Sequence, residues 1–142
     1  MIAALAPAGV PNCDILVTDE IGDQLCAVQV KTRRGKGSDR GWHMSKKHEA
    51  LTSHTLFYCF VDFAIGTGGI PFTYIVPARV VAQTLGECHQ AWLALPGAKG
   101  QPHNDSEFRR FLPDYAHLAM SKYEDGWLEP YRENWDVLQR SE

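Results

Sequence analysis

The run TLFYCFVDFA at residues 55–64 limits the possible folds more than any other part of the chain. It is rich in aromatic and β-branched residues, which favour β-strands, and it is apolar at both odd and even positions apart from Asp62. Because successive side chains of a strand point to opposite faces, a strand of this kind is covered on both sides. We therefore expect residues 55–64 to form a central strand of a sheet.

Three other segments have the composition of strands. Residues 12–18 and 25–31 are separated by a turn that contains Gly22, so they are expected to form a hairpin. Residues 72–76 follow the glycine-rich turn after the central run and form the fourth expected strand. The sequence therefore predicts a four-stranded sheet.

Helices are expected mainly after the strands. Ser45 is a good N-cap and predicts a short helix after it, and Pro77 suits the first turn of a longer helix that Gly86 could interrupt. Shorter helices are expected towards the C-terminus, with Ser106 and Asp114 as caps of the first two, at residues 106–112, 114–124 and 129–139. This order indicates an α/β or α+β fold built on a mixed sheet flanked by helices.

The size and composition indicate one globular domain. The chain has 142 residues, of which 44% are hydrophobic and 22% are charged, so it can bury a core and is not expected to be disordered. We expect a single domain over residues 1–142, with a core at residues 11–95 and a helical C-terminal part at residues 104–140.

The charge is unevenly distributed. The whole chain carries a net charge of −3, but between Lys31 and Glu49 seven basic residues face two acidic ones, a local charge of +5. A basic segment on an otherwise acidic protein indicates contact with a polyanion. A solvated loop that keeps the protein soluble is the alternative. The candidate nucleic-acid contacts are Arg33, Arg34, Lys36, Arg40, Lys46, Lys47 and His48.

Cysteine spacing and hydropathy exclude several other classes. The cysteines at positions 13, 26, 59 and 88 form no Cys-x-x-Cys pair, so we expect reduced thiols in a cytoplasmic protein instead of a structural zinc site. The start of the chain has no basic residue before Pro7, and no run reaches the ~18 apolar residues that span a bilayer. We therefore expect neither a signal peptide nor a membrane partner.

Three polar residues interrupt the apolar hairpin strands. Gln29 and Lys31 are two positions apart and share one face, and a turn near Gly22 puts Asp14 opposite residues 29–31. Facing side chains of neighbouring strands have Cβ atoms about 4.5–5.5 Å apart, so the three groups can converge. Carboxylate and amide oxygens suit Mg²⁺, and a nearby lysine can hold a phosphate. A simple cross-strand Asp–Lys ion pair is the structural alternative.

The pattern Pro-x-x-Asp followed by Gln-x-Lys on the next strand resembles the core of the PD-(D/E)xK nuclease superfamily. Pro11, Asp14, Gln29 and Lys31 match it, with glutamine where the superfamily usually has an acid. The segments VKTR, GWHMSKKHE, LFYCFVDF and YIVPARVVA are similar to those of small bacterial proteins of this superfamily, and the resemblance covers most of residues 11–135.

The resemblance implies a restriction-endonuclease-like fold and Mg²⁺- or Mn²⁺-dependent hydrolysis of phosphodiester bonds. Asp14 and Gln29 would be metal ligands together with the main-chain carbonyl of Val30, and Lys31 would contact the phosphate and the attacking water. The expected partner is nucleic acid, DNA in preference to RNA, and nucleases of this kind often form homodimers.

Two departures from the superfamily pattern bear on activity. The superfamily usually has a helix with a glutamate before the first strand, but only ten residues precede Pro11 and none is acidic. Either the true start lies upstream, or this helix is truncated or missing. Gln29 is neutral, so a single carboxylate would hold the metal, and low occupancy is expected. Whether the chain is an enzyme thus stays open. A catalytically dead nucleic-acid-binding module and a protein-interaction partner of the same fold are the alternatives.

Six further residues have competing interpretations. His48 could shuttle a proton but is expected to lie idle on a helix surface, and Trp42 is expected to pack instead of stacking on a base. The four-residue spacing of Trp127, Tyr131 and Trp135 predicts a buried helical stripe. Asp62 either caps its strand or joins the site.

Overall fold

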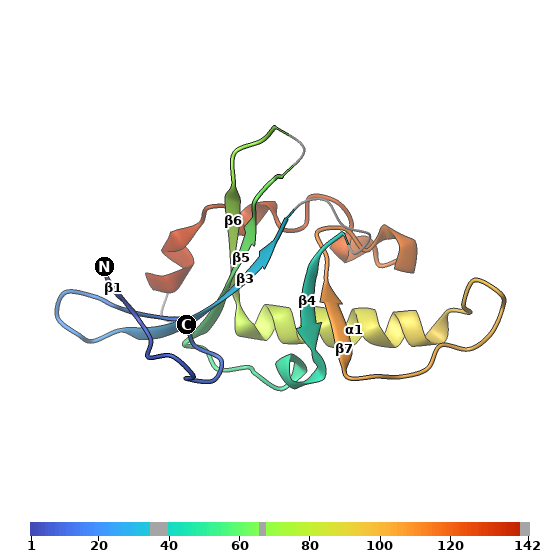
Figure 1. Cartoon of the computed structure of the whole chain (residues 1–142), viewed down its shortest axis with the longest axis horizontal. Helices are drawn as coiled ribbons and strands as arrows, with labels where there is room; N and C mark the ends of the chain where they lie inside the picture. Colours follow the sequence, from blue (N-terminus) through green and yellow to red (C-terminus); the bar gives the residue numbers. More distant parts are fainter. Residues whose placement is uncertain (35–39, 66–67, 140–142) are drawn as a thin grey trace.

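The structure, a computed structural model that describes residues 1–34, 40–65 and 68–139, contains a mixed sheet of five strands. Every neighbouring pair is antiparallel except the parallel pair β3–β5 (Figure 1). In spatial order the strands are β1 (Ile2–Leu5), β2 (Ile15–Thr18), β3 (Leu25–Arg33), β5 (Leu56–Asp62) and β6 (Phe72–Pro77). The expected mixed sheet and its β2–β3 hairpin are therefore confirmed.

A second, two-stranded sheet and one long helix lie against the first sheet. The antiparallel strands β4 (Trp42–Ser45) and β7 (Phe108–Phe111) form the small sheet, and the helix α1 (Ala78–Ala94) crosses behind both of them (Figure 1). The other helical segments are short 3₁₀ turns: η1 (Lys46–Glu49), η2 (Ala116–Leu118), η3 (Ser121–Tyr123), η4 (Glu129–Tyr131) and η5 (Trp135–Gln139). None of the helices in the described ranges is long and apolar enough to cross a membrane.

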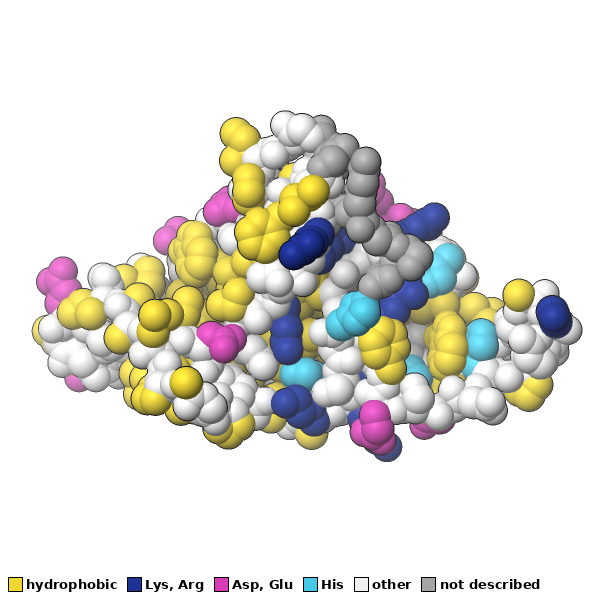
Figure 2. Space-filling model, viewed as in Figure 1, with side chains coloured by type: hydrophobic (Ala, Val, Ile, Leu, Met, Phe, Trp, Pro, Cys, Tyr) yellow, Lys and Arg dark blue, Asp and Glu magenta, His cyan; other side chains and the backbone are white. Residues whose placement is uncertain are grey.

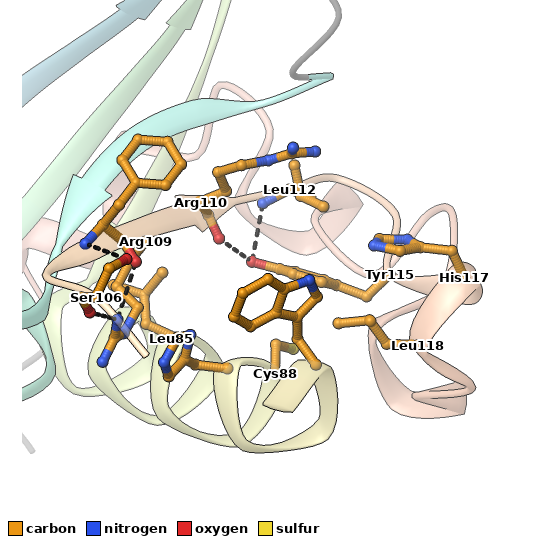
Figure 3. A pocket seen from close by; sticks show the side chains of 12 residues that line it. Leu85, Cys88, Ser106, Arg109, Arg110, Leu112, Tyr115, His117 and Leu118 are labelled. Carbon is orange, nitrogen blue, oxygen red and sulfur yellow. Dashed lines mark hydrogen bonds between the residues drawn. The ribbon is translucent and has the colours of Figure 1, made fainter. Parts of the chain in front are cut away.

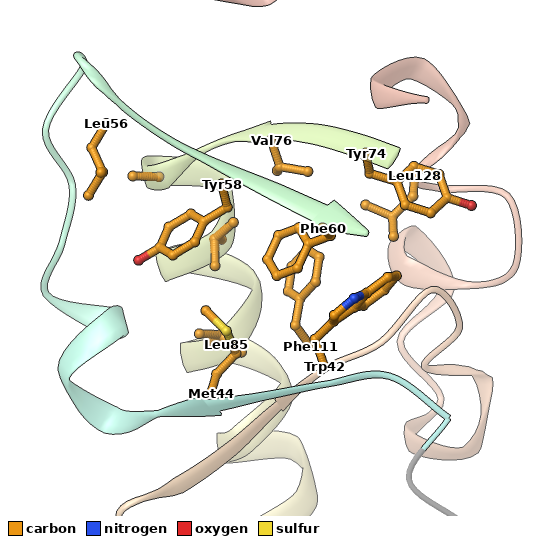
Figure 4. Close-up of a cluster of buried hydrophobic side chains, with 12 residues drawn as sticks. Trp42, Met44, Leu56, Tyr58, Phe60, Tyr74, Val76, Leu85, Phe111 and Leu128 are labelled. Atoms are coloured by element: carbon orange, nitrogen blue, oxygen red, sulfur yellow. The ribbon is translucent and has the colours of Figure 1, made fainter. Parts of the chain in front are cut away.

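The strand β5 divides the core into two layers. Tyr58 and Phe60 point to one face, where they pack with residues of the small sheet and α1 (Figure 4). Phe57 and Cys59 point to the other face and pack with the C-terminal turn η5. The expectation of an interior strand covered on both sides is thus confirmed.

The first face is built from stacked aromatic rings. The Phe60 and Phe111 rings lie 4.2 Å apart and nearly parallel, and Trp42 packs beside them with 1% of its surface exposed. This packing fastens the small sheet to the main sheet. It also confirms that Trp42 packs inside the protein.

Three helix predictions after α1 are wrong. Residues 108–111 form β7 because Arg109 and Phe111 turn inward while Phe108 and Arg110 turn outward, an alternation that only a strand gives. Residues 114–124 form two 3₁₀ turns in place of a helix. Pairing with β4 therefore overrides the local helical preference.

The C-terminal helix predicted at residues 129–139 is also broken. Pro130 lies in the first turn of η4, and the Asn134 side chain donates a hydrogen bond to the Pro130 carbonyl, so the chain turns between η4 and η5. Trp135 is 38% exposed, and the expected buried aromatic stripe does not form. In the described ranges, the sheet is therefore flanked by the single α-helix α1 and by short 3₁₀ turns.

Other departures lie near the ends of elements. The main sheet has five strands instead of four because Ile2–Leu5 pair with β2 as an edge strand. The predicted helix after Ser45 is a single 3₁₀ turn, and α1 continues through Gly86 without a break. A β-carbon at Gly86 would meet no atom within 4 Å, so nothing crowds the helix there.

Replacing one ring of the aromatic stack tests this packing. Phe111→Ala removes a side chain with 0% exposure and should lower the free energy of unfolding by about 3–5 kcal/mol. Phe108→Ala, on the same strand but 47% exposed, is the matched control and should change it by less than about 1 kcal/mol. Chemical denaturation measures both, and equal losses would contradict the assigned faces of β7.

Candidate functional site

The register of the hairpin brings the three polar residues predicted from the sequence to one face of the main sheet. Ile15 pairs with Val28, so Asp14, one position before β2, lies opposite Gln29. Gln29 and Lys31 alternate with Val28 and Val30, which pack on the other face. All three polar side chains therefore lie on the face that also carries Tyr58 and the small sheet.

The backbone holds Asp14 in place from both sides. Its N–H donates to the Val28 carbonyl at 2.9 Å, and its carbonyl accepts from the N–H of Ala6 at 2.8 Å. The carboxylate oxygen Oδ2 accepts the Val30 N–H at 2.7 Å, so the side chain replaces a missing ladder bond. The other oxygen, Oδ1, has no hydrogen-bond partner in the described part of the chain and can bind a ligand.

Lys31 lies half-buried between an acid and another lysine. Burial lowers the pKa of its ammonium group, Lys47 lowers it further, and Asp14 opposes the shift. No ion pair within 4.0 Å joins Asp14 to Lys31 among the described residues, so the simple cross-strand pair does not form. A charge held this way is stabilised by any anion that enters the site.

His48 is buried, which corrects the expectation of an idle residue on a helix surface. Only 2% of its surface is exposed, because η1 turns the imidazole inward against Tyr58, with ring centroids 5.8 Å apart. Its Nδ1 lies 3.0 Å from the Ser45 amide nitrogen and 3.0 Å from the Ser45 carbonyl oxygen, so the Ser45 backbone holds the ring in either tautomer. Burial, the largest cause, and the nearby Lys31 and Lys47 lower its pKa, while the Ser45 backbone raises it.

Within the described residues, five buried side-chain polar atoms lack a hydrogen-bond partner, and three of them lie near Lys31. These three are Gln29 Oε1, His48 Nε2 and the Tyr58 hydroxyl. Gln29 and Tyr58 are paired across β3 and β5, and Figure 4 shows the Tyr58 hydroxyl directed towards the segment that joins η1 to β5. Buried polar atoms of this kind normally have partners, and each orphan costs about 1–3 kcal/mol. Their concentration beside Lys31 is typical of a functional site.

Tyr58 is a member of this group that sequence reasoning missed. The residue lies in an apolar strand and its burial is complete, which raises the pKa of its hydroxyl. The one feature of the sequence that could have indicated a role for Tyr58 is its hydroxyl group on a strand expected to be covered on both faces. Tyr58 lies beside Gln29 because β3 and β5 pair in parallel, and this register cannot be predicted from the local sequence.

Most of the basic residues predicted to contact nucleic acid are exposed. The side chains of Lys46 and Lys47 are exposed on η1, and Arg34 and Arg40 are exposed next to the gap in the described chain, in which Lys36 lies. Figure 2 shows Lys, Arg and His side chains gathered over the junction of β3, β4 and η1, with an acidic side chain beside them. These exposed residues can meet a polyanion directly.

Arg33 has a structural role instead. Its guanidinium binds the Asp62 carboxylate at 2.7 Å, donates to the Arg40 carbonyl and lies 4.3 Å from the centre of the Trp42 ring. Asp62 also accepts the Ala64 N–H at 2.8 Å, so it caps the end of β5. This settles the open interpretation of Asp62, which lies away from Asp14 and Gln29 at the far end of the strand pair.

The donor atoms at the site suit a hard divalent cation but provide little charge. Among the described residues, Gln29 Oε1 is buried without a partner and Asp14 Oδ1 is on an exposed side chain, and the Val30 carbonyl belongs to the same corner of the sheet. Hard oxygen ligands are what Mg²⁺ and Mn²⁺ prefer. No group of three or more His, Cys, Asp or Glu residues that could hold a metal occurs in the described ranges, so Asp14 would be the one anionic ligand.

The cysteines have no part in this site. All four are free, and Cys26, Cys59 and Cys88 are buried, which raises their pKa values, that of Cys59 to about 11. Thiols of this kind stay protonated and unreactive at neutral pH.

Comparison with protein-family models, with curated proteins and with solved structures finds no match to this chain.

Removing the Tyr58 hydroxyl tests whether this group is buried without a hydrogen-bond partner. Tyr58→Phe should leave the free energy of unfolding unchanged or raise it by about 1 kcal/mol, because no hydrogen bond is lost. Tyr115→Phe is the matched control: its hydroxyl accepts the buried Leu112 N–H, so the loss should be about 1–3 kcal/mol. A large loss in the Tyr58 variant, measured by urea unfolding, would show a partner that the structure lacks.

The pH dependence of stability tests the environment of His48. Its pKa is lowered on folding, so the unfolded chain binds the proton first and stability falls as the pH drops below about 6.5. His48→Gln should remove this part of the acid sensitivity while other groups keep theirs. The measurement compares the unfolding free energies of both proteins between about pH 5 and 8. Identical pH profiles would rule out the assigned burial.

Proposed function

We propose that the chain is a divalent-cation-dependent nuclease or nuclease-like protein that acts on nucleic acid, in a reducing, cytoplasmic setting. The fold proposed is a variant of the restriction-endonuclease-like fold. Support comes from the mixed sheet, in which an antiparallel hairpin carries Asp14 opposite Gln29 and Lys31, and β3 runs parallel to the next strand.

The observation that carries the proposal is the corner around Lys31. A half-buried ammonium group with a lowered pKa, a carboxylate with one available oxygen and three orphaned polar atoms occur together there. Burial of the ammonium group and of the orphaned atoms is unfavourable for stability alone, whereas the Asp14 carboxylate is exposed and open to a ligand. Together they match the needs of a phosphate ester and its metal ion.

Each residue has a distinct part in the proposed reaction. Asp14 and Gln29, with the Val30 carbonyl, would hold the cation, which would polarise the phosphate when bound. Lys31 would contact a phosphate oxygen and orient the attacking water. The exposed Lys46 and Lys47 would neutralise neighbouring phosphates, and DNA is the preferred substrate.

A binding module without catalysis is the second candidate, and one observation favours it. Gln29 is neutral and the site has one carboxylate, so cation affinity is lower than in a site with two or three acids. Salt-sensitive binding of DNA without cleavage would identify this case. A protein-interaction role predicts instead no nucleic-acid binding at low salt and a protein partner that stays bound during purification.

Plasmid nicking in the presence of Mn²⁺ or Mg²⁺ tests the proposal. We expect slow nicking by the natural chain, loss to background in Lys31→Ala, and about tenfold more activity in Gln29→Glu, which adds a second anionic ligand. Lys99→Ala, an exposed lysine in the loop after α1, is the matched control and should behave like the natural chain. Nicking that survives in Lys31→Ala, or that ignores chelation of the metal, would reject the catalytic assignment.

A further inference from the structure

The small sheet has an outer face that the proposed site does not use. His43, Phe108 and Arg110 point outward, and the register places His43 opposite Arg110. Phe108 is 47% exposed, although a phenyl ring on a small sheet would normally be buried. An exposed aromatic ring beside a cation is the combination on which nucleobases stack and phosphates bind.

The outer face of the small sheet lies directly next to the basic turn η1. Ser45, the last residue of β4, pairs with Phe108, and the exposed Lys46 and Lys47 follow directly. The Lys46 N–H donates to the Glu107 carbonyl at 2.8 Å, which ties η1 to the start of β7. A strand of nucleic acid held by η1 therefore meets Phe108 and Arg110 next.

A pocket of about 370 Å³ opens beside β7, between α1 and η2 (Figure 3). Its apolar lining comes from Leu85, Cys88, Leu112 and Leu118, and Trp92 and Phe108 add aromatic surface. The volume is at the lower end of the range for small ligands, so the pocket takes one ring system and not a helix or a polymer backbone.

Arg110 is the charged group at the pocket that favours an anionic ligand. The buried Arg109 already contacts Glu49 and the carbonyls of Ser106 and Phe108, so its charge is balanced. Arg110 is exposed and has no ion-pair partner within the described residues. Asp105 lies beside the pocket, where its carboxylate contacts His89 at 2.7 Å and Arg109 at 3.8 Å, although no Asp or Glu is among the described residues that line the pocket.

The pocket itself is chemically inert. Burial raises the pKa of the Cys88 thiol to about 12, so it does not act as a nucleophile at neutral pH. The Tyr115 hydroxyl is committed to the Leu112 N–H and the Arg110 carbonyl. Its features suit binding of a ring, not reaction with it.

We propose that the outer face of the β4–β7 sheet and the pocket beside β7 bind a single strand of DNA, one base of which enters the pocket. Phe108 stacks against a base at the mouth, and Arg110 contacts the phosphate beside it. A base inside a duplex cannot enter such a pocket without leaving its stack, so the surface selects single-stranded DNA. The choice of nucleic acid as ligand rests on the proposed function.

Fluorescence anisotropy with a labelled single strand of about twelve nucleotides, in the presence of a chelator, tests this inference. We expect Phe108→Ala to bind the strand about tenfold more weakly. For Arg110→Ala, the slope of the logarithm of the binding constant against the logarithm of the salt concentration should become shallower by about 0.7, because one phosphate contact is lost. Ser106→Trp, at an exposed position on the rim, should block the pocket and weaken binding to the normal strand. A strand with abasic sites should bind the natural chain and Ser106→Trp equally.

Matched controls and a second ligand make the result decisive. Trp135→Ala and Lys99→Ala remove an exposed ring and an exposed cation elsewhere and should bind like the natural chain. Wild-type affinity in both the Phe108 and Arg110 variants, or tighter binding of duplex than of single strand, would overturn the inference. Because the assay excludes the metal, loss of nicking alone would count against the proposed catalysis and leave this surface standing.

Discussion

The parallel pairing of β3 with β5 is the constraint on which the rest of the structure depends. Seven consecutive residue pairs, from Ala27 with Leu56 to Arg33 with Asp62, fix how the two strands align. This alignment sets Gln29 beside Tyr58 and places the Arg33–Asp62 ion pair at the far end. A shift by one residue would turn Gln29 and Lys31 into the opposite apolar layer, so the register is strongly enforced.

Around Lys31, the stability gained from buried apolar side chains offsets the cost of burying polar groups. The aromatic stack around Phe60 and Phe111 gains stability from apolar area and close ring contacts. That gain offsets the cost of the orphaned atoms of Gln29, His48 and Tyr58. Strained or unsatisfied groups persist only where surrounding packing holds them, which is why the site lies against the rigid core and not on a loop.

The sequence predicted the parts of this protein whose local pattern is strong. The interior strand, the β2–β3 hairpin and the position of Asp14 opposite Gln29 all follow from side-chain alternation and a short turn. Ser106 and Asp114 suit helix caps and so predict helices after α1, but the pairing of residues 108–111 with β4 spans more than sixty residues of sequence and has no local signal. His48, Tyr58 and Phe108 were missed or misjudged for the same reason: their burial or exposure depends on elements distant in sequence.

Selective paramagnetic broadening in ¹H–¹⁵N spectra is the most direct test of the claim that Asp14 and Gln29 hold a divalent cation. With substoichiometric Mn²⁺, signals of the backbone amides at positions 14 and 29–31 and of the Gln29 side chain should broaden first. In Asp14→Asn the same addition should leave them sharp. Broadening confined to acidic residues elsewhere, or equal broadening in both proteins, would contradict the metal site and with it the proposed catalysis.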